Sequence, residues 1–372
     1  MSLQVVTSFA RRVAADLGTA RHPVRDPLRH LQEAEAWLER AHDASGDGGV
    51  SYGWSLRGGW KPSYRETSGY ILTTFFNLAE LRQRPAWRER ALRVARWLLS
   101  VQNGDGSIAN PRYGPDGIVF DTGQVLFGLV RAYRETRDLA FLSAATRAGR
   151  WLVTAADPDR RWTRHEHFGT PHVYNTRTAW ALLQLDGVAR DPDFVAVARA
   201  NLDWAVAEQR DGYFRHCAFK PGVPPYTHTI AYTIRGLLES GRLLGDARYV
   251  ESAASAARAM REHLRDDGFI AGQVDEDGRD RASYCCLTGN CQLAIAWAKL
   301  HESTGDEAWR RAAIRALDYV MSCQDVETDD LNVRGAIAGS HPIWGRYAPL
   351  SYPNWATKFF VDAMILRTRW TP

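Results

Sequence analysis

Lysines and cysteines are scarce in this sequence, and no apolar run is long enough to cross a membrane. The only lysines are Lys61, Lys220, Lys299 and Lys358, and the 47 basic residues form no cluster. A nucleic-acid-binding protein more often carries a basic stripe, so we expect no nucleic-acid partner. The N-terminus also lacks the apolar core of a signal peptide. We therefore expect a soluble, cytoplasmic protein with no membrane partner.

The five cysteines form no regular framework, which is typical of reduced thiols in a cytoplasm. Three histidines crowd the stretch RWTRHEHFGTPHVYNTR (161–177), and three cysteines the stretch SYCCLTGNCQLA (283–294). Neither stretch has a recognisable metal-ligand spacing, so we predict no metal; a zinc site at Cys217, Cys285 and Cys286 stays open as an alternative. Phosphate-binding, dinucleotide-binding and G-x-S-x-G motifs are absent, and we expect no cofactor.

An internal repeat organises the chain. The segments 91–107, 144–162 and 197–214 each read as a helix, an aromatic residue and a turn, and place Trp97, Trp151 and Trp204 at intervals of 54 and 53 residues. Met260 and Tyr319 continue this series, and Trp37 precedes it. In the first of these segments apolar residues recur at i, i+3, i+4 and i+7, which predicts helices that are buried on one face only.

Between these one-sided helices lie six segments that are apolar on nearly all faces, which predicts buried helices. They are 69–81, 122–133, 176–188, 229–241, 288–300 and 356–367. The first one-sided helix precedes the first buried helix, and the last buried helix ends the chain. One helical hairpin is thus formed by the first and the last helix of the chain. Such a hairpin joins the two ends of a closed ring, whereas an open solenoid has no contact between its ends. We therefore predict an all-α fold, a single (α/α)6 toroid over 26–372, preceded by an arm at 1–25.

Every buried helix begins with polar residues. These clusters are Glu66-Thr67-Ser68, Asp121-Thr122, Asn175-Thr176-Arg177, His228-Thr229, Thr288 with Asn290, and Asn354 with Lys358. The simplest interpretation is N-capping by short polar side chains, and we expect it for the threonines. Capping has no use for arginine, histidine or aromatic side chains. Because all six starts meet at one rim of a ring, the sequence predicts a polar, aromatic-lined bowl suited to an anionic ligand.

Candidate site residues follow from this rim. Glu66 and Asp121 are paired carboxylates on adjacent helices, as acid and base chemistry on glycosides requires, and His228 or Tyr174 could also transfer a proton. The alternative is that Asp121 only caps a helix, that Glu66 only pairs with an arginine, and that His228 is a core residue. The candidate substrate-binding residues are Trp54, Trp60, Tyr64, Gln124, His167, Asn175, Arg177, Tyr226, Tyr284, Asn290, Trp344, Trp355 and Lys358. Among these, we expect Arg177 to hold a carboxylate and Trp54, Trp60 and Trp355 to stack on sugar rings.

The stretches GGWKPSYRETSGYI, VFDTGQVLFGLVRAYRETRD, YNTRTAWALLQL and NWATKFFVDAMI resemble bacterial six-hairpin toroid proteins associated with polysaccharide biosynthesis loci. The resemblance runs over most of residues 50–365. More distantly, the architecture is similar to sugar epimerases, uronyl epimerases, unsaturated glucuronyl hydrolases and polysaccharide lyases. The resemblance implies a saccharide substrate and acid/base catalysis at the mouth of the toroid, with Glu66, Asp121, His228 and Tyr174 at positions that match by role.

The sequence thus predicts an enzyme acting on an acidic or amino sugar as an epimerase, lyase or glycoside hydrolase. A non-catalytic toroid that binds a glycan or a partner is the main alternative. Terpenoid cyclases have similar turns, faintly echoed in VQNGDGSI, but no D-x-D-D motif follows here. Zinc-dependent lanthionine cyclases have a C-H-G run that is absent. The sequence leaves the oligomeric state open.

Overall fold

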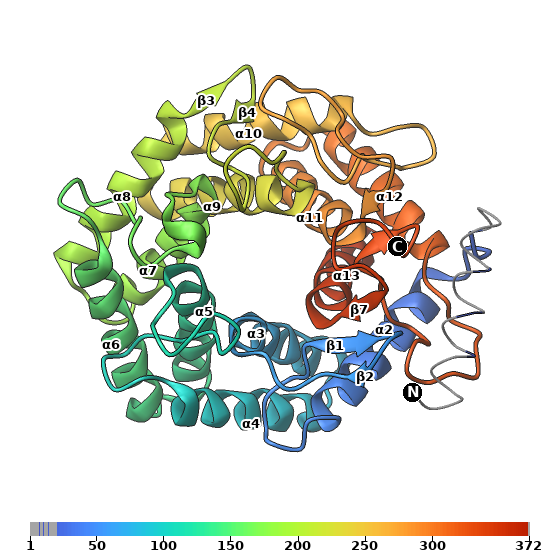
Figure 1. The fold of residues 1–372 in the computed structure, drawn as a ribbon, viewed down its shortest axis with the longest axis horizontal. Helices are drawn as coiled ribbons and strands as arrows, with labels where there is room; N and C mark the ends of the chain where they lie inside the picture. Colours follow the sequence, from blue (N-terminus) through green and yellow to red (C-terminus); the bar gives the residue numbers. More distant parts are fainter. Residues whose placement is uncertain (1–6, 8–9, 11–13, 15–20, 371–372) are drawn as a thin grey trace.

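The computed structural model of the protein describes residues 21–370 together with residues 7, 10 and 14. Twelve α-helices of this described part form two concentric rings (Figure 1). The inner ring consists of α3 (Arg65–Arg82), α5 (Val119–Thr136), α7 (Thr176–Asp186), α9 (Thr227–Leu244), α11 (Leu287–Thr304) and α13 (Asn354–Arg367). The outer ring consists of α2 (Pro27–Asp43), α4 (Pro85–Val101), α6 (Leu139–Ala155), α8 (Pro192–Ala207), α10 (Ala247–Glu262) and α12 (Glu307–Ser322).

The predicted (α/α)6 toroid is confirmed, including its closure by the two ends of the chain. Outer helix α2 packs against inner helix α13, and α13 also contacts α3. The Trp37 indole of α2 donates a hydrogen bond of 2.7 Å to the Asn332 carbonyl, and His30 Nδ1 lies 2.6 Å from Gln324 Oε1. Most of the predicted arm 1–25 lies outside the described residues. At its described end, Arg21 pairs with Asp267 at 2.8 Å.

The outer helices are buried along one stripe, as their periodicity predicts. In α4 the buried residues are Trp87, Ala91, Val94, Ala95 and Leu98, whereas the inner helix α5 buries residues on every side. None of the helices in the described part is both long and apolar enough to span a bilayer.

Helix capping differs between the two rings, and the expectation for the inner threonines is wrong. Five outer helices have an aspartate N-cap whose carboxylate accepts a backbone N–H bond. None of the six inner helices has a side-chain cap. Inner hydroxyls instead accept bonds from the incoming loops: Ser68 from Val50 N–H and Thr122 from Ile108 N–H, each at 3.0 Å. The polar helix starts therefore fasten the rim loops to the inner ring.

Neighbouring inner helices approach each other closely at glycines. A Cβ built on Gly69 of α3 would lie 2.5 Å from the Val125 Cα of α5, and one on Gly123 would lie 2.6 Å from the Thr178 hydroxyl of α7. Only a residue without a side chain allows the helices to come this near. Both contacts lie near the starts of the inner helices, where α3, α5 and α7 approach one another.

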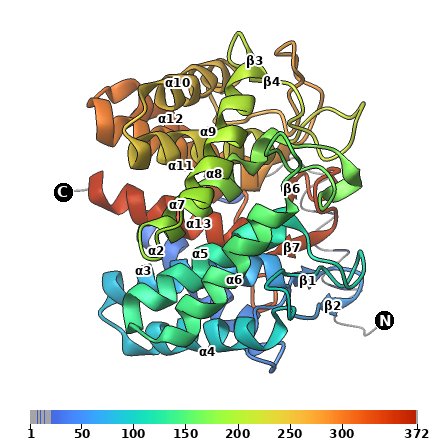
Figure 2. The same cartoon turned by 90° about the vertical axis from the view of Figure 1, so that its left-hand side faces the viewer.

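The described part of the chain contains seven short strands. The strands labelled in Figure 2 gather with long loops at one end of the toroid. β1 (Gly53–Ser55) pairs antiparallel with β2 (Gly59–Trp60) and with β7 (Ser351–Pro353), so that Trp54 faces both Trp60 and Tyr352 in register. The other pairs are β3 (Gln209–Arg210) with β4 (Tyr213–Phe214) and β5 (Cys285–Cys286) with β6 (Ser340–His341). Short 3-10 turns occur at His167–Gly169, Val173–Asn175 and Thr368–Trp370. The sheet β2-β1-β7 joins residues from both ends of the chain on the rim.

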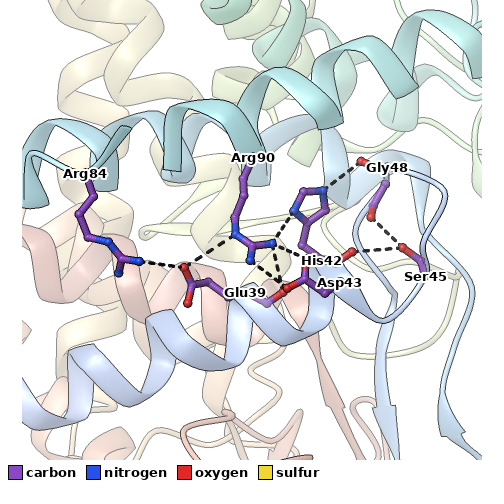
Figure 3. Close-up of polar contacts among 8 residues, drawn as sticks. Glu39, His42, Asp43, Ser45, Gly48, Arg84 and Arg90 are labelled. Carbon is purple, nitrogen blue, oxygen red and sulfur yellow. Dashed lines mark hydrogen bonds and ion pairs between the residues drawn. The ribbon is translucent and has the colours of Figure 1, made fainter. Parts of the chain in front are cut away.

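A polar network ties α2 to α4 on the outer surface (Figure 3). The Arg90 guanidinium forms two bonds to the Asp43 carboxylate, at 2.5 and 2.8 Å, and lies 3.1 Å from His42 Nδ1. Burial, and then the charge of Arg90, lowers the pKa of His42 to about 4. The neutral ring thus accepts from Arg90 at Nδ1 and donates from Nε2 to the Gly48 carbonyl at 3.2 Å.

Candidate active site

A cavity of about 520 Å³ opens on the rim where the inner helices begin. Its volume lies within the usual range for small-molecule sites. Aromatic rings make up much of its wall. The lining residues are Tyr52, Tyr64, Glu66, Thr67, Tyr70, Arg112, Tyr113, Phe120, His167, Phe168, Phe219, Lys220, Val223, Pro224, Tyr226, His228, Tyr232, Tyr347, Ala348 and Trp355.

Two carboxyl groups stand at one side of this cavity, in the first turns of the adjacent helices α3 and α5. Glu66 lines the cavity, while Asp121 is fully buried behind it. The Asn110 amide donates to Asp121 Oδ2 at 3.0 Å and to the Tyr64 hydroxyl at 2.8 Å. Burial, and next the negative charge of Asp121, raises the pKa of Glu66 well above the usual carboxyl range. The protonated form of Glu66 is therefore favoured, as a group that donates a proton requires.

His167 completes this side of the site from the loop before α7. Its Nε2 lies 3.6 Å from Asp121 Oδ1, and its ring meets the Tyr113 ring edge-on at 5.0 Å. Burial acts to lower the pKa of His167, but the contact with Asp121 outweighs it and the net pKa is raised. The neighbouring Glu166 is also buried, which raises its pKa to about 8, and it accepts a 2.7 Å bond from Asn175.

His228, at the start of α9, lies in another part of the cavity wall, surrounded by rings. Its ring centre is 4.4 Å from that of Tyr347, 5.3 Å from Phe219 and 5.6 Å from Tyr232. Burial lowers the pKa of His228 to about 3, so the imidazole is neutral at ordinary pH. Its Nδ1 has no hydrogen-bond partner among the described residues.

Two cationic side chains belong to the exposed mouth of the cavity. The Arg112 guanidinium lies 4.1 Å from the centre of the Tyr52 ring, and the Lys220 ammonium 4.7 Å from that of Phe168. Both residues are exposed, and neither forms an ion pair with a carboxylate within the part of the chain that the structure describes. Two unpaired cations beside aromatic rings suit a ligand with an anionic group.

Arg177, Lys358 and Gln124 do not line the cavity, contrary to the sequence-based expectation. Arg177 is 5% exposed; its Nε donates to Gln124 Oε1 at 2.6 Å, and its guanidinium lies 4.8 Å from the Tyr232 ring centre. The Lys358 ammonium pairs with Asp362 at 2.6 Å, and burial lowers its pKa to about 8. These groups are enclosed among aromatic rings, two of which, Tyr70 and Tyr232, belong to the cavity wall. A buried arginine in such a cage is not placed to hold a carboxylate in the cavity.

Seven further candidates also lie outside the cavity. Tyr174 is fully buried against His172, with a ring separation of 4.6 Å, and has no hydrogen-bond partner in the described region. The remaining candidates are engaged elsewhere: Trp54 and Trp60 in the rim sheet, Asn175 with Glu166, Asn290 with the Gly268 carbonyl, and Tyr284 and Trp344 in a separate depression. The candidates that the fold does bring together are Tyr64, Glu66, His167, Tyr226, His228 and Trp355, with Asp121 directly behind them.

Several residues reach the cavity from the rim loops and are not among the candidates predicted from the sequence. They include Arg112 and Tyr113 before α5, Phe168 before α7, Phe219 and Lys220 before α9, and Tyr347 before α13. The only available signal was position, since each of these aromatic or basic residues lies in a loop that leads into an inner helix. The five cysteines are all buried and form no disulfide within the described residues, which also contain no cluster of histidine, cysteine and acidic side chains arranged for a metal ion.

Known structures share the fold. An unsaturated glucuronyl hydrolase specific for heparin superposes with a TM-score of 0.75 at 16% identity, covering 93% of this chain and 98% of that one. An unsaturated glucuronyl hydrolase variant from Streptococcus agalactiae, complexed with dGlcA-GalNAc6S, gives 0.69 at 14% identity, covering 94% and 97%. The cellobiose 2-epimerase of Bacillus thermoamylovorans gives 0.70 at 13% identity, covering 97% and 100%.

No protein-family model and no curated protein matches the sequence. At these low identities the similarity to solved structures establishes the (α/α)6 toroid fold.

Proposed function

We propose that this protein is a carbohydrate-active enzyme that hydrolyses the bond beside an acidic terminal sugar. The observation that carries the proposal is a pair of carboxyl groups, Glu66 in the wall of an aromatic cavity and the buried Asp121 behind it, with unpaired cations at the mouth of that cavity. Hydrolysis of glycosides commonly uses one protonated carboxyl group as the general acid and one carboxylate as the base or nucleophile.

In this proposal Glu66 is the acid. Its raised pKa keeps the proton on the carboxyl group near neutral pH, where it can be donated to the sugar. Asp121, held by Asn110 and facing His167, is the partner that orients and stabilises the groups around the reacting water. The surrounding rings offer flat apolar faces on which a sugar ring can stack.

The acidic character of the substrate rests on Arg112 and Lys220. Guanidinium and ammonium groups bind carboxylates and sulfates through charge-assisted hydrogen bonds. The toroid from Streptococcus agalactiae carries dGlcA-GalNAc6S, a ligand with such groups, which supports testing the same class here. The same mixture of cations, histidines and hydroxyls argues against a terpenoid substrate, which needs a dry apolar cavity.

Epimerisation is a second candidate, favoured by one specific observation. His167 and His228 line the same cavity, and the neutral His228 has a free Nδ1 among the described residues. A neutral imidazole can take a proton from a sugar carbon, and a second group can return one to the opposite face. The epimerase among the solved toroids gives this alternative its fold precedent.

Proton NMR time courses in D2O separate these functions, with a panel of acidic oligosaccharides that includes dGlcA-GalNAc6S and with cellobiose. New reducing-end signals, lost in Glu66→Gln but retained in the control Glu89→Gln, on the exposed surface of α4, are expected for hydrolysis. A changed ring configuration with deuterium at that carbon, dependent on His228, identifies an epimerase instead. Line broadening without any product identifies a binding protein and overturns both proposals.

A further inference from the structure

A second depression, of about 390 Å³, lies on the rim next to the candidate active site. It is formed by the loop that leads into α11 and by the loop between β6 and β7. Its lining residues are Gln273, Arg281, Ala282, Ser283, Tyr284, Pro342, Trp344, Gly345 and Arg346. The size falls within the range of ligand sites, and the proposed hydrolysis gives this depression no part.

Buried hydrogen bonds and close packing shape the depression. The Tyr284 hydroxyl donates to Gln273 Oε1 at 3.0 Å, and the Gln273 amide donates to the Pro224 carbonyl at 2.8 Å. Gly345 packs closely against the tyrosine, since a Cβ there would lie 2.7 Å from Tyr284 Cγ. This contact fixes the loop, so that Trp344 and Arg346, on either side of the glycine, both line the depression.

The two side chains beside Gly345 are exposed, and both are of types that can contact a ligand. Trp344 is 43% exposed, which is unusual for the largest apolar side chain. Arg346 is exposed and has no carboxylate partner within the described part of the chain, whereas Arg281 is already paired with Asp275 at 2.5 Å. An exposed indole and an arginine without a carboxylate partner, lining the same depression, suit a sugar that bears a carboxylate or a sulfate.

Tyr226 connects the active-site cavity to the loop that lines this depression. Tyr226 lines the cavity, and its hydroxyl lies 3.5 Å from the Arg346 carbonyl, to which it donates. The residue after Arg346, Tyr347, lines the cavity as well and packs on His228. The depression therefore lies beside the cavity on the side of Tyr226, where the loop that carries Trp344 and Arg346 runs into Tyr347.

We propose that Trp344 and Arg346 form a second saccharide subsite, which holds a further acidic unit of an oligosaccharide whose terminal sugar occupies the active-site cavity. The inference rests on the proposed function, because it presupposes a saccharide in that cavity. It makes the preferred substrate an oligosaccharide longer than a disaccharide.

The test compares KM for di-, tetra- and hexasaccharides of chondroitin that end in an unsaturated uronyl group. The wild-type protein is expected to show a KM roughly tenfold lower for the hexasaccharide than for the disaccharide, as one stacked ring and one charged contact supply. Trp344→Ala and, separately, Arg346→Gln are expected to bring this ratio close to one. Arg279→Gln, which removes an exposed arginine that pairs with Asp277 outside the depression, is the matched control and keeps the ratio.

Equal KM values for all lengths in the wild-type protein, or an unchanged ratio in both variants, overturn the subsite. If instead Arg215→Gln removes the length dependence, the sugar chain runs into the neighbouring depression lined by Arg215, and the proposal is wrong.

Calorimetric binding of the same oligosaccharides to Glu66→Gln separates this inference from the proposed function. Tighter hexasaccharide binding that is lost on adding Trp344→Ala or Arg346→Gln, without turnover by the wild-type protein, keeps the subsite and refutes the hydrolysis. Turnover by the wild-type protein without length-dependent binding keeps the proposed hydrolysis and refutes the subsite.

Discussion

Replacing Glu166 by glutamine tests whether this buried carboxyl group is protonated in the folded protein. Glu166 is 8% exposed; its Oε1 accepts from Asn175, and its Oε2 has no partner among the described residues. Burial raises its pKa from 4.5 to about 8. Because the folded pKa lies above the unfolded one, the folded state keeps a proton that the unfolded chain has already released. The stability from this proton is fully present below about pH 4.5 and is lost as the pH rises through about 8.

The magnitude follows from the two pKa values. A pKa difference of about 3.5 corresponds to about 4.8 kcal/mol in total, of which about 3.5 kcal/mol is lost between roughly pH 5 and pH 8. The glutamine has no proton to lose. Any fixed cost of its unpartnered amide is the same at both pH values and cancels in the difference between them.

The measurement is urea unfolding of the wild-type protein, Glu166→Gln and the exposed control Glu89→Gln at both pH values. We expect the free energy of unfolding to fall less in Glu166→Gln than in the other two proteins, by about 3.5 kcal/mol. An equal fall in all three proteins would show that Glu166 is ionised at neutral pH, and the reasoning from burial would fail.

Three further predictions concern the site and the fold. Glu66→Gln should lower kcat by about 10² to 10⁴. Burial and the neighbouring Asp121 raise the pKa of Glu66, so the wild-type rate should fall at alkaline pH as the protonated form disappears. A pH–rate profile without this alkaline fall contradicts the role of Glu66 as the acid. Arg112→Gln should raise KM roughly tenfold for an acidic substrate and leave the KM of a neutral analogue unchanged, since it removes one charge-assisted contact; steady-state kinetics on the pair would show equal effects if the arginine only packs on tyrosine. Gly69→Ala should lower the free energy of unfolding by about 1–3 kcal/mol, because the new Cβ would lie 2.5 Å from the Val125 Cα. The control in urea unfolding is Gly104→Ala, whose Cβ would have no atom within 4 Å, and a similar loss there would refute the packing argument.

The fold was predictable because helical periodicity carries enough information. One-sided segments alternate with segments apolar on every side, and this contrast distinguishes α4 from α5 without any knowledge of contacts. The order of the segments then implied ring closure, which the packing of α2 on α13 confirms. The capping of the inner helices was wrongly predicted, since Ser68 and Thr122 bond to loop backbone that is distant in sequence.

The candidate site was predictable only in part. The start of an inner helix locates a residue near the rim, but the direction of its side chain depends on the neighbouring helices. Glu66 and His228 therefore reach the cavity, while Arg177 is enclosed beneath aromatic rings. Loop residues such as Arg112 escape any periodic pattern, because loops reach the cavity by a path that the sequence does not reveal.

By itself, the sequence determined the number of helices, their division into two rings and the end at which polar chemistry collects. These properties follow from hydrophobic periodicity and chain order, which are local. Only the tertiary structure decided that Glu66, Asp121 and His167 form one group. It also placed Arg112 and Lys220 at the mouth of the active-site cavity and Trp344 in a second depression. Those relations depend on side-chain direction and on contacts between distant segments, and such contacts exist only once the ring has closed.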